Sequence, residues 1–255
     1  MVERVPAQRI SKSGTIPVEE IVAVEEPLEI RVNGINWVTT MRTPGEDNEL
    51  ITGLIYTEGI ISNHNEVVEI RIDGNEADVS GDFDINSHQR GFVRSSSCGI
   101  CGRASLDAML LRNPPKIPEY GFQIPAVIIH EIIDNFRDVQ PMFGMTGGVH
   151  AVALFDTRGN ISQISEDVGR HNAMDKVIGG QIDNLPLYER GFILSGRVSF
   201  EMMQKAVICG CPAVVAIGAP TTLAIELARQ HGITLVGFVR EGRFNVYTGA
   251  WRIKN

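Results

Sequence analysis

The sequence predicts an α/β protein in which a large domain of alternating strands and helices follows a smaller α+β domain. Beyond about residue 125, apolar runs of strand length alternate with amphipathic helical segments. Before residue 80, short β-like runs are joined by turn sequences. The segment from 80 to 103 lacks apolar periodicity and is rich in Gly, Ser, Asn and Asp, which indicates a long loop.

These patterns divide the 255-residue chain into four segments. Residues 1–15 are polar and are expected to be disordered, and residues 16–80 are expected to form the small α+β domain. A mobile loop that carries two cysteines is expected over residues 81–103, and the large α/β domain over residues 104–255. A chain of this length can bury one large core beside a small one.

The small domain is expected to contain two hairpins and one helix. Asn33-Gly34 and Asp73-Gly74 are dipeptides typical of tight hairpin turns. Residues 46–56 have a helical pattern, with Pro44 close to its start. The β-like runs cover residues 20–24, 28–32, 37–41, 67–72 and 77–79.

The large domain is expected to be built on a mostly parallel sheet. Strands that alternate with helices normally pair in parallel, and the helices then cover both faces of the sheet. Asn113-Pro114-Pro115 ends a further helix, expected at 104–111, ahead of this pattern. Strands are expected at 149–155, 161–165, 192–194, 213–217 and 234–238, and helices at 126–139, 170–178, 199–208 and 221–230.

Composition and charge exclude several classes of protein. Hydrophobic residues make up 43% of the chain and charged residues 21%, and no apolar run reaches the roughly 20 residues of a membrane span. The first residues contain no hydrophobic segment of a secretory signal, so a cytoplasmic protein is expected. The net charge of -8 argues against general nucleic-acid binding, while it leaves room for a local basic pocket that holds a small anion.

The four cysteines indicate metal binding or thiol chemistry, because the cytoplasm keeps thiols reduced. Cys98 and Cys101 stand three residues apart among Ser and Gly. This arrangement fits three alternatives: half of a metal site, a dithiol redox pair, or a nucleophile that carries a group. Zinc needs two more ligands, and the C-x-C spacing of Cys209 and Cys211 matches zinc sites poorly, so no zinc is expected. A redox pair normally opens a helix in a thioredoxin-like pattern, which is absent here, but this alternative stays open.

Three expected helix starts meet at one edge of the sheet and carry residues suited to an anion. Ligands collect beyond the carboxyl ends of such strands, where helix N-termini present free N–H groups. Each start combines glycine with Ser, Thr or Arg. These residues also have an ordinary explanation as helix caps and solvated arginines, which stays open. The candidate residues are Arg170, His171, Ser195, Gly196, Arg197, Ser199 and Thr221, with Arg240 and Arg243 after the last strand.

The element order resembles the cytidine deaminase fold, a three-layer α/β domain. Zinc deaminases carry H-x-E at the start of the second helix and P-C-x-x-C at the start of the third. The corresponding residues here are His171 and Ala173, then Ser195 to Ser199, so the general-base Glu and both Cys ligands are missing. The resemblance therefore implies a deaminase-like shape without deaminase chemistry, with a pocket rebuilt around arginine.

Five motifs in order resemble the formate dehydrogenase accessory protein family of FdhD-type sulfurtransferases, over most of the chain from about residue 20. They are CGICG from residue 98, TGGVHA from 146, EDVGRHNAMDK from 166, SGRVS from 195 and NVYT from 245. The resemblance implies a sulfur carrier that takes persulfide sulfur from a cysteine desulfurase. According to the resemblance, the carrier transfers this sulfur to molybdenum bis(molybdopterin guanine dinucleotide), a bound substrate needed by formate dehydrogenase. The resemblance also implies a deaminase-like fold and a homodimer.

The same resemblance assigns roles to particular residues. Cys98 corresponds to the persulfide intermediate, and Cys101 to an auxiliary residue. A thiolate is the reactive form, and Arg94 or Arg103 would favour it. The cofactor-binding segment corresponds to Phe238, Val239, Arg240, Glu241, Gly242 and Arg243.

Chemistry alone suggests further contacts to such a cofactor. The arginine-bearing helix starts are expected to hold a pyrophosphate, and Glu166 or Asp167 to pair with the guanine base. His150 is expected to be a structural histidine. Two alternatives remain beside the carrier: a dithiol redox protein, and a non-catalytic molybdenum cofactor chaperone that would not need the cysteine loop.

Overall fold

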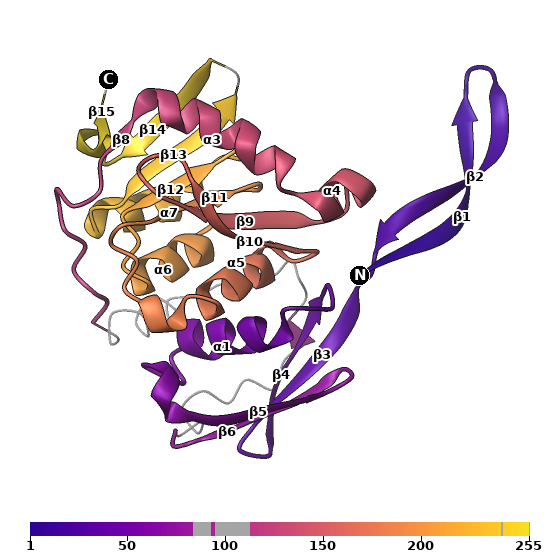
Figure 1. Ribbon diagram of the computed structural model, residues 1–255, viewed down its shortest axis with the longest axis horizontal. Helices are drawn as coiled ribbons and strands as arrows, with labels where there is room; N and C mark the ends of the chain where they lie inside the picture. The colour runs from indigo at the N-terminus through magenta and orange to yellow at the C-terminus, as the bar shows by residue number, and fades with distance from the viewer. Residues whose placement is uncertain (84–92, 95–112, 241, 255) are drawn as a thin grey trace.

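The computed structural model of the protein describes residues 1–83, 93–94, 113–240 and 242–254 and shows a mixed α/β architecture (Figure 1). The helix expected at 104–111 lies outside these residues, as does most of the expected cysteine loop. Within the described residues, no helix combines the length and the apolar composition that a membrane span requires.

The small domain is a five-stranded sheet with one helix on it. The hairpin turn at Asn33-Gly34 is confirmed, with φ values of 50° and 75° that this turn type requires. The second hairpin and the helix are also confirmed. The helix α1 (Asp47–Glu58) buries Leu50, Ile51 and Leu54 against the sheet. The strands are β3 (Glu26–Val32), β4 (Ile35–Arg42), β5 (Val67–Asp73), β6 (Glu76–Gly81) and β7 (Val93–Arg94), in the order β5-β6-β3-β4-β7, with the short helix η1 (His64–Glu66) before β5.

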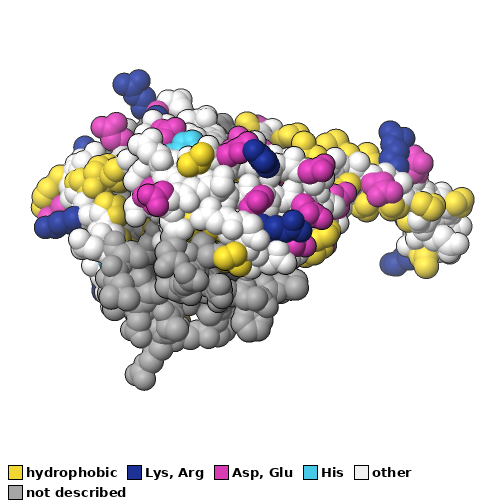
Figure 2. Space-filling view, turned by 90° about the horizontal axis from the view of Figure 1, so that it is seen from below, with side chains coloured by type: hydrophobic (Ala, Val, Ile, Leu, Met, Phe, Trp, Pro, Cys, Tyr) yellow, Lys and Arg dark blue, Asp and Glu magenta, His cyan; other side chains and the backbone are white. Residues whose placement is uncertain are grey.

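The N-terminal residues form a hairpin that projects from the body, where the sequence predicts disorder over residues 1–15 (Figure 1). Strands β1 (Val2–Ser11) and β2 (Gly14–Ala23) pair along their whole length. Ion pairs cross between them, from Arg4 to Glu19 at 3.0 Å and from Arg9 to Glu20 at 2.7 Å. Acidic, basic and apolar side chains are all exposed on the face of this arm that Figure 2 shows. The charged residues that indicate disorder in the sequence are therefore cross-strand partners in the structure.

The large domain is built on a six-stranded sheet that is mixed, so the expectation of a mostly parallel sheet is wrong. Only the pairs β11–β12 and β12–β13 are parallel. The pairs β9–β10 and β13–β14 are hairpins, and a short connection can join only antiparallel strands. The strands are β9 (His150–Phe155), β10 (Ile161–Asp167), β11 (Gly191–Leu194), β12 (Ala213–Ala216), β13 (Thr234–Arg240) and β14 (Arg243–Thr248), in the order β10-β9-β11-β12-β13-β14.

Helices cover both faces of this sheet, as expected (Figure 1). Alternate residues of each strand face opposite cores. Val214 packs towards α5, α6 and α7, while Val215 packs towards α3. The helices are α3 (Ala126–Asp138) on one face, and α5 (Arg170–Gly179), α6 (Phe200–Ile208) and α7 (Thr222–Gln230) on the other. The remaining elements are α4 (Pro141–Thr146), which the sequence did not predict, β8 (Ile124–Pro125), β15 (Ile253–Lys254), η3 (Ile182–Asn184) and η4 (Ala250–Arg252).

The two domains meet where α1 crosses α5, and two glycines allow this crossing. A Cβ atom added to Gly53 would overlap the carbonyl oxygen of Asp175, and one added to Gly179 would overlap that of Glu49. The two backbones are therefore in direct contact. This contact fixes the small domain against α5, whose first turn belongs to the candidate site.

We expect Gly53→Ala to destabilise the protein by about 1–3 kcal/mol, because the new methyl group has no room between α1 and α5. The free energy of unfolding by urea measures this loss. Gly144→Ala is the matched control, since the space around Gly144 in α4 is open and alanine favours a helix. Equal stability of the two variants would show that the crossing is loose.

Candidate functional site

The candidate site lies at the edge of the large sheet where β9 begins and β10 and β11 end. Asp167, the last residue of β10, pairs with His150, the first residue of β9. The residue after β11, Ser195, exchanges two hydrogen bonds with Ala151: its Oγ accepts from the Ala151 N–H at 2.9 Å and its own N–H donates to the Ala151 oxygen at 3.0 Å. Ser195 is therefore held rigidly beside His150.

Two glycines, Gly196 after β11 and Gly218 after β12, allow close packing at this edge. A Cβ atom on Gly196 would lie 3.3 Å from Nδ1 of His150, so glycine leaves room for the imidazole ring. A Cβ atom on Gly218 would clash with the backbone of Gly196. The loops that follow β11 and β12 thus lie in contact along the edge.

The starts of α6 and α7 are joined, and their two capping hydroxyls differ. The Val198 N–H donates to the Ala219 oxygen at 3.1 Å, and the Thr221 N–H to the Val198 oxygen at 3.0 Å. The Thr221 hydroxyl caps α7 by accepting from the Ala224 N–H. The Ser199 hydroxyl makes no such cap at α6, and within the described residues its buried Oγ has no hydrogen-bond partner. Thr221 therefore has a structural role, whereas Ser199 has a free hydrogen-bonding group.

Two arginines give this edge its positive charge. Burial lowers the pKa of Arg170, and the nearby charge of Arg197 lowers it further, with Glu201 acting in the opposite direction. Among the described residues, neither arginine has a carboxylate within ion-pair distance, and the buried Nε of Arg170 has no hydrogen-bond partner. His171 follows in the first turn of α5. Two close guanidinium groups of this kind suit an anionic ligand.

His150 also belongs to this edge, which the sequence did not predict. Burial lowers its pKa below the usual range, and the charge of Arg170 lowers it further, although Asp167 raises it. The imidazole is therefore neutral at pH 7 and can both donate and accept a hydrogen bond. Its place as the last residue of TGGVH, directly before an apolar strand, is the signal that could have revealed it.

A cavity of about 470 Å³ opens at the same edge, on the side of α3 and α4. Polar groups at its wall come from Arg137, His150 and Ser195, and apolar groups from Phe143 and Ile217. A concave site with an apolar wall and a few polar groups is the usual form of a small-molecule site.

The segment after β13 places some of its predicted residues towards solvent and one in the core. Phe238 has a left-handed φ of 53°, is 44% exposed, and donates its N–H to the Gly218 oxygen at 3.1 Å. Arg240 donates to the Ile217 oxygen at 2.7 Å. The side chain of Val239 is fully buried beneath α3, so it cannot itself contact a cofactor.

The β13–β14 turn completes this part of the edge. Gly242 occupies the turn with φ 73°, and Arg243 beyond it is exposed. Glu241 lies outside the described residues. Phe238, which precedes this turn, combines a strained left-handed φ with an exposed ring, a combination typical of a ligand-contacting position.

The expected guanine-pairing role is wrong for Asp167, and Glu166 has partners within the protein. The Asp167 carboxylate is fully buried and lies 2.8 Å from Nζ of Lys176. The Glu166 carboxylate accepts from the backbone N–H groups of Met142 and Phe143 at 2.9 and 2.7 Å, and so caps α4. Both carboxylates are used within the protein, because they hold the backbone that surrounds the site.

The four cysteines form two pairs in different parts of the chain. Cys98 and Cys101 lie outside the described residues. Cys209 and Cys211 are fully buried, and burial raises the pKa of the Cys211 thiol to about 12. The two buried cysteines are therefore small core residues, and the Cys211 thiol does not form a reactive thiolate. No group of three or more metal-ligating side chains occurs in the described part of the chain.

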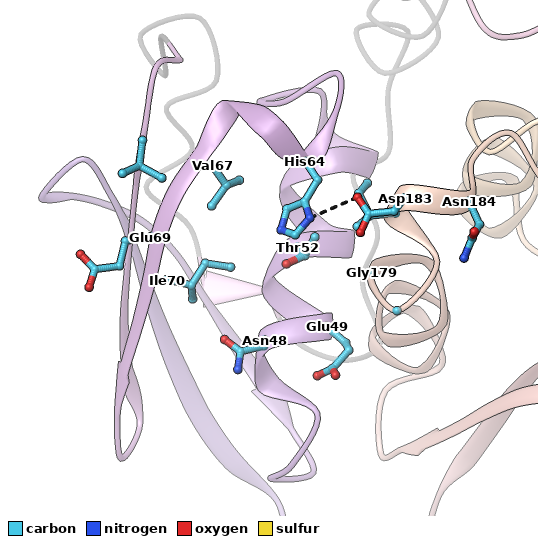
Figure 3. A pocket seen from close by; sticks show the side chains of 13 residues that line it. Asn48, Glu49, Thr52, His64, Val67, Glu69, Ile70, Gly179, Asp183 and Asn184 are labelled. Carbon is cyan, nitrogen blue, oxygen red and sulfur yellow. Dashed lines mark hydrogen bonds and ion pairs between the residues drawn. The ribbon is translucent and has the colours of Figure 1, made fainter.

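A second cavity, of about 460 Å³, lies at the other end of α5, between α1 and β5 (Figure 3). His64 and Asp183 point towards each other across it, with Nδ1 and Oδ1 3.3 Å apart. Its wall includes Glu49, Glu69 and Gly179. None of the residues predicted from the sequence lines this cavity, so it is not part of the candidate site.

Residues 23–254 match the FdhD/NarQ family. The chain belongs to this family. It is 45% identical over 242 residues to the sulfur carrier protein FdhD of Sulfolobus acidocaldarius, which covers 92% of each chain. It is 38% identical over 259 residues to the sulfur carrier protein FdhD of Nocardia farcinica, which covers 97% of this chain and 93% of that one. The resemblance drawn from the five motifs is therefore confirmed.

A solved structure has the same fold as this FdhD/NarQ family member. It is described as a formate dehydrogenase accessory protein from Desulfotalea psychrophila. The two chains are 25% identical, superpose with a TM-score of 0.81, and cover 99% of each other. The α/β architecture described above is thus shared across nearly the whole chain.

We expect Arg170→Ala to raise the pKa of His150, because the substitution removes a positive charge that disfavours the imidazolium form. NMR titration of the imidazole carbon-bound protons measures the change. Arg229→Ala serves as the control, since Arg229 lies in the last turn of α7, at the other end of that helix from the site. An unchanged pKa in Arg170→Ala would contradict the electrostatic effect of Arg170 on His150.

Proposed function

We propose that this protein is a cytoplasmic sulfurtransferase that carries sulfur on Cys98 and delivers it to a molybdenum cofactor needed by formate dehydrogenase. The observation that carries the proposal is a pair of arginines, Arg170 and Arg197, beside the Ser199 hydroxyl. Among the described residues, neither arginine has a carboxylate partner and the hydroxyl has no hydrogen-bond partner. These groups favour a phosphate-bearing ligand. The curated relatives, which are named sulfur carrier proteins, support the carrier role.

The donor is proposed to be a cysteine desulfurase, which presents sulfur as a persulfide. The Cys98 thiolate attacks the outer sulfur, a new S–S bond forms, and the desulfurase cysteine leaves as a thiolate. The sulfur now on Cys98 needs two electrons to leave as sulfide. Attack of the Cys101 thiolate on Cys98 supplies them, releases hydrosulfide to the cofactor and leaves a Cys98–Cys101 disulfide.

The acceptor is proposed to be molybdenum bis(molybdopterin guanine dinucleotide), bound as a substrate. Its pyrophosphate groups suit Arg170 and Arg197 at the starts of α5 and α6. Its planar rings suit the exposed ring of Phe238, and Arg240 and Arg243 lie next to that ring in the sequence. The aromatic and the cationic groups of one edge would thus recognise different parts of one ligand.

The partners follow from the two ends of this transfer. We infer that the protein meets a cysteine desulfurase and formate dehydrogenase, and that it works as a homodimer. The net charge of -8 favours neither nucleic acid nor an acidic membrane surface as a partner. A dithiol redox protein would use both cysteines without binding sulfur, and a cofactor chaperone would use neither.

Incubation with a desulfurase and cysteine is expected to add about 32 Da, one sulfur atom, to Cys98. Mass spectrometry of the intact protein and of its peptides measures the adduct. Cys98→Ala should abolish it, while Cys209→Ala should not, because Cys209 is buried. Wild-type protein without an adduct would leave the redox and chaperone alternatives, and an undiminished adduct in Cys98→Ala would assign the carrier to another residue.

Arg197→Ala is expected to weaken binding of GDP by about 10- to 100-fold, because a hydrogen bond to a charged group contributes about 1.5–3 kcal/mol. Isothermal titration calorimetry measures the affinity. Arg229→Ala removes the same charge from an exposed position far along α7 and should bind GDP as the wild type does. Equal affinities of the two variants would remove Arg197 from the binding site.

A further inference from the structure

A buried polar network joins the small domain to the corner between β10 and α5. Its members come from β4 and the residue just after it, and from the segment that surrounds Arg170. They are almost inaccessible to solvent, with exposures of 0% to 6%. The members are Thr40, Thr43, Asp167, Asn172 and Lys176.

Asn172, in the first turn of α5, connects the two sides through its amide group. Its Nδ2 donates to the backbone oxygen of Met41 at 2.7 Å and to the Asp167 carboxylate at 3.0 Å. Its Oδ1 accepts from the Thr40 hydroxyl at 3.2 Å. One side chain therefore binds β4, the end of β10 and the start of α5 together.

Asp167 and Lys176 extend the network to the residue after β4. The Asp167 carboxylate accepts from the backbone N–H of Thr43 at 3.1 Å and from that of Gly169 at 2.8 Å. Lys176 donates to the Thr43 oxygen at 2.9 Å, and the Val168 N–H donates to the Thr43 hydroxyl at 3.1 Å. The residues on each side of Arg170 are thus tied to the end of β4.

Strand β4 also supports β7, the last described residues before the carrier cysteine in the sequence. The two strands are parallel, and Thr39 and Thr40 of β4 pair with Val93 and Arg94 of β7. Cys98 follows Arg94 by four residues in the sequence. Thr40 is therefore shared: its backbone pairs with β7 and its side chain binds Asn172.

We propose that Asn172 is a positioning residue, which sets the place of Arg170 relative to the strand pair β4–β7 during sulfur transfer. This inference rests on the proposed sulfur-carrier function. A buried ion pair and its hydrogen bonds add little stability over an apolar core, whereas they do define one arrangement of the groups they join. Here the groups joined are the ligand-binding corner and the strand that leads to the carrier segment. Transfer depends on their relative placement, while loading by a desulfurase does not.

The protein contains a second buried network that serves as a matched control. The Asp175 carboxylate accepts from Lys205 Nζ at 2.6 Å and from the Thr57 hydroxyl at 2.9 Å. Lys205 also donates to Thr57 at 2.8 Å. This network joins α1, α5 and α6 at similar burial, and these contacts involve no residue of β4 or β7. If a substitution in the first network acted only by lowering stability, a substitution in the second network should therefore have the same effect on transfer.

The test compares Asn172→Ala with Thr57→Ala in the full chain. Each protein is loaded with sulfur by a desulfurase, then mixed with sulfur-free cofactor, and loss of the sulfur from Cys98 is followed by mass spectrometry. Asn172→Ala should transfer about tenfold more slowly, with its loading rate unchanged within about twofold. Thr57→Ala should load and transfer as the wild type does. Equal slowing in both variants, or no slowing in Asn172→Ala, would overturn the proposal.

Hydrogen exchange gives a second measurement that needs no sulfur. Backbone amides of β4 and β7 should exchange about tenfold faster in Asn172→Ala than in Thr57→Ala, because only the first substitution removes the hydrogen bonds from α5 to Thr40 and Met41 of β4. Unchanged exchange in these strands would overturn the positioning role whether or not the protein carries sulfur. If the two variants differ in exchange as expected and the wild-type protein accepts no sulfur, the proposed function is overturned, while Asn172 still positions β4 and β7 relative to α5.

Discussion

The buried ion pair between Asp167 and Lys176 is the interaction on which the candidate site depends. Asp167 ends β10 with a carboxylate that water cannot reach, so it needs partners from within the protein. Lys176 neutralises this carboxylate, which also accepts hydrogen bonds from the backbone N–H groups of Thr43 and Gly169 and from the Asn172 amide. Because this negative charge is satisfied by Lys176, it does not pair with Arg170, whose charge stays available to a ligand.

Local sequence signals predicted most elements of this fold and missed those whose stability comes from pairing across the chain. Asn33-Gly34 predicts its hairpin because the turn itself requires those residues. The N-terminal hairpin has polar strands, and its ion pair between Arg4 and Glu19 joins residues that are distant in sequence. Strand β14 was missed because Arg240 to Arg243 has the composition of a ligand loop, although it is also a hairpin turn.

The candidate site was predicted in its backbone and less well in its side chains. Helix starts carry recognisable residues, so local sequence points to Arg170, Ser195 and Arg197, which the structure places at one edge of the sheet. The role of Asp167 depends on Thr43, which is 124 residues away, and no local pattern reveals that hydrogen bond. His150 was missed for the same reason, because its surroundings come from the ends of β10 and β11.

Arg170 carries its charge in an unfavourable environment at this edge. Arg170 is partly desolvated and is repelled by Arg197, and both effects lower its pKa. An anion between the two guanidinium groups would cancel the repulsion between Arg170 and Arg197, and it would accept a hydrogen bond from the buried Nε of Arg170. With a net charge of -8, the protein does not attract anions over long distances. Selection of the proposed cofactor would therefore act at short range, through these donors and through contacts with the exposed ring of Phe238.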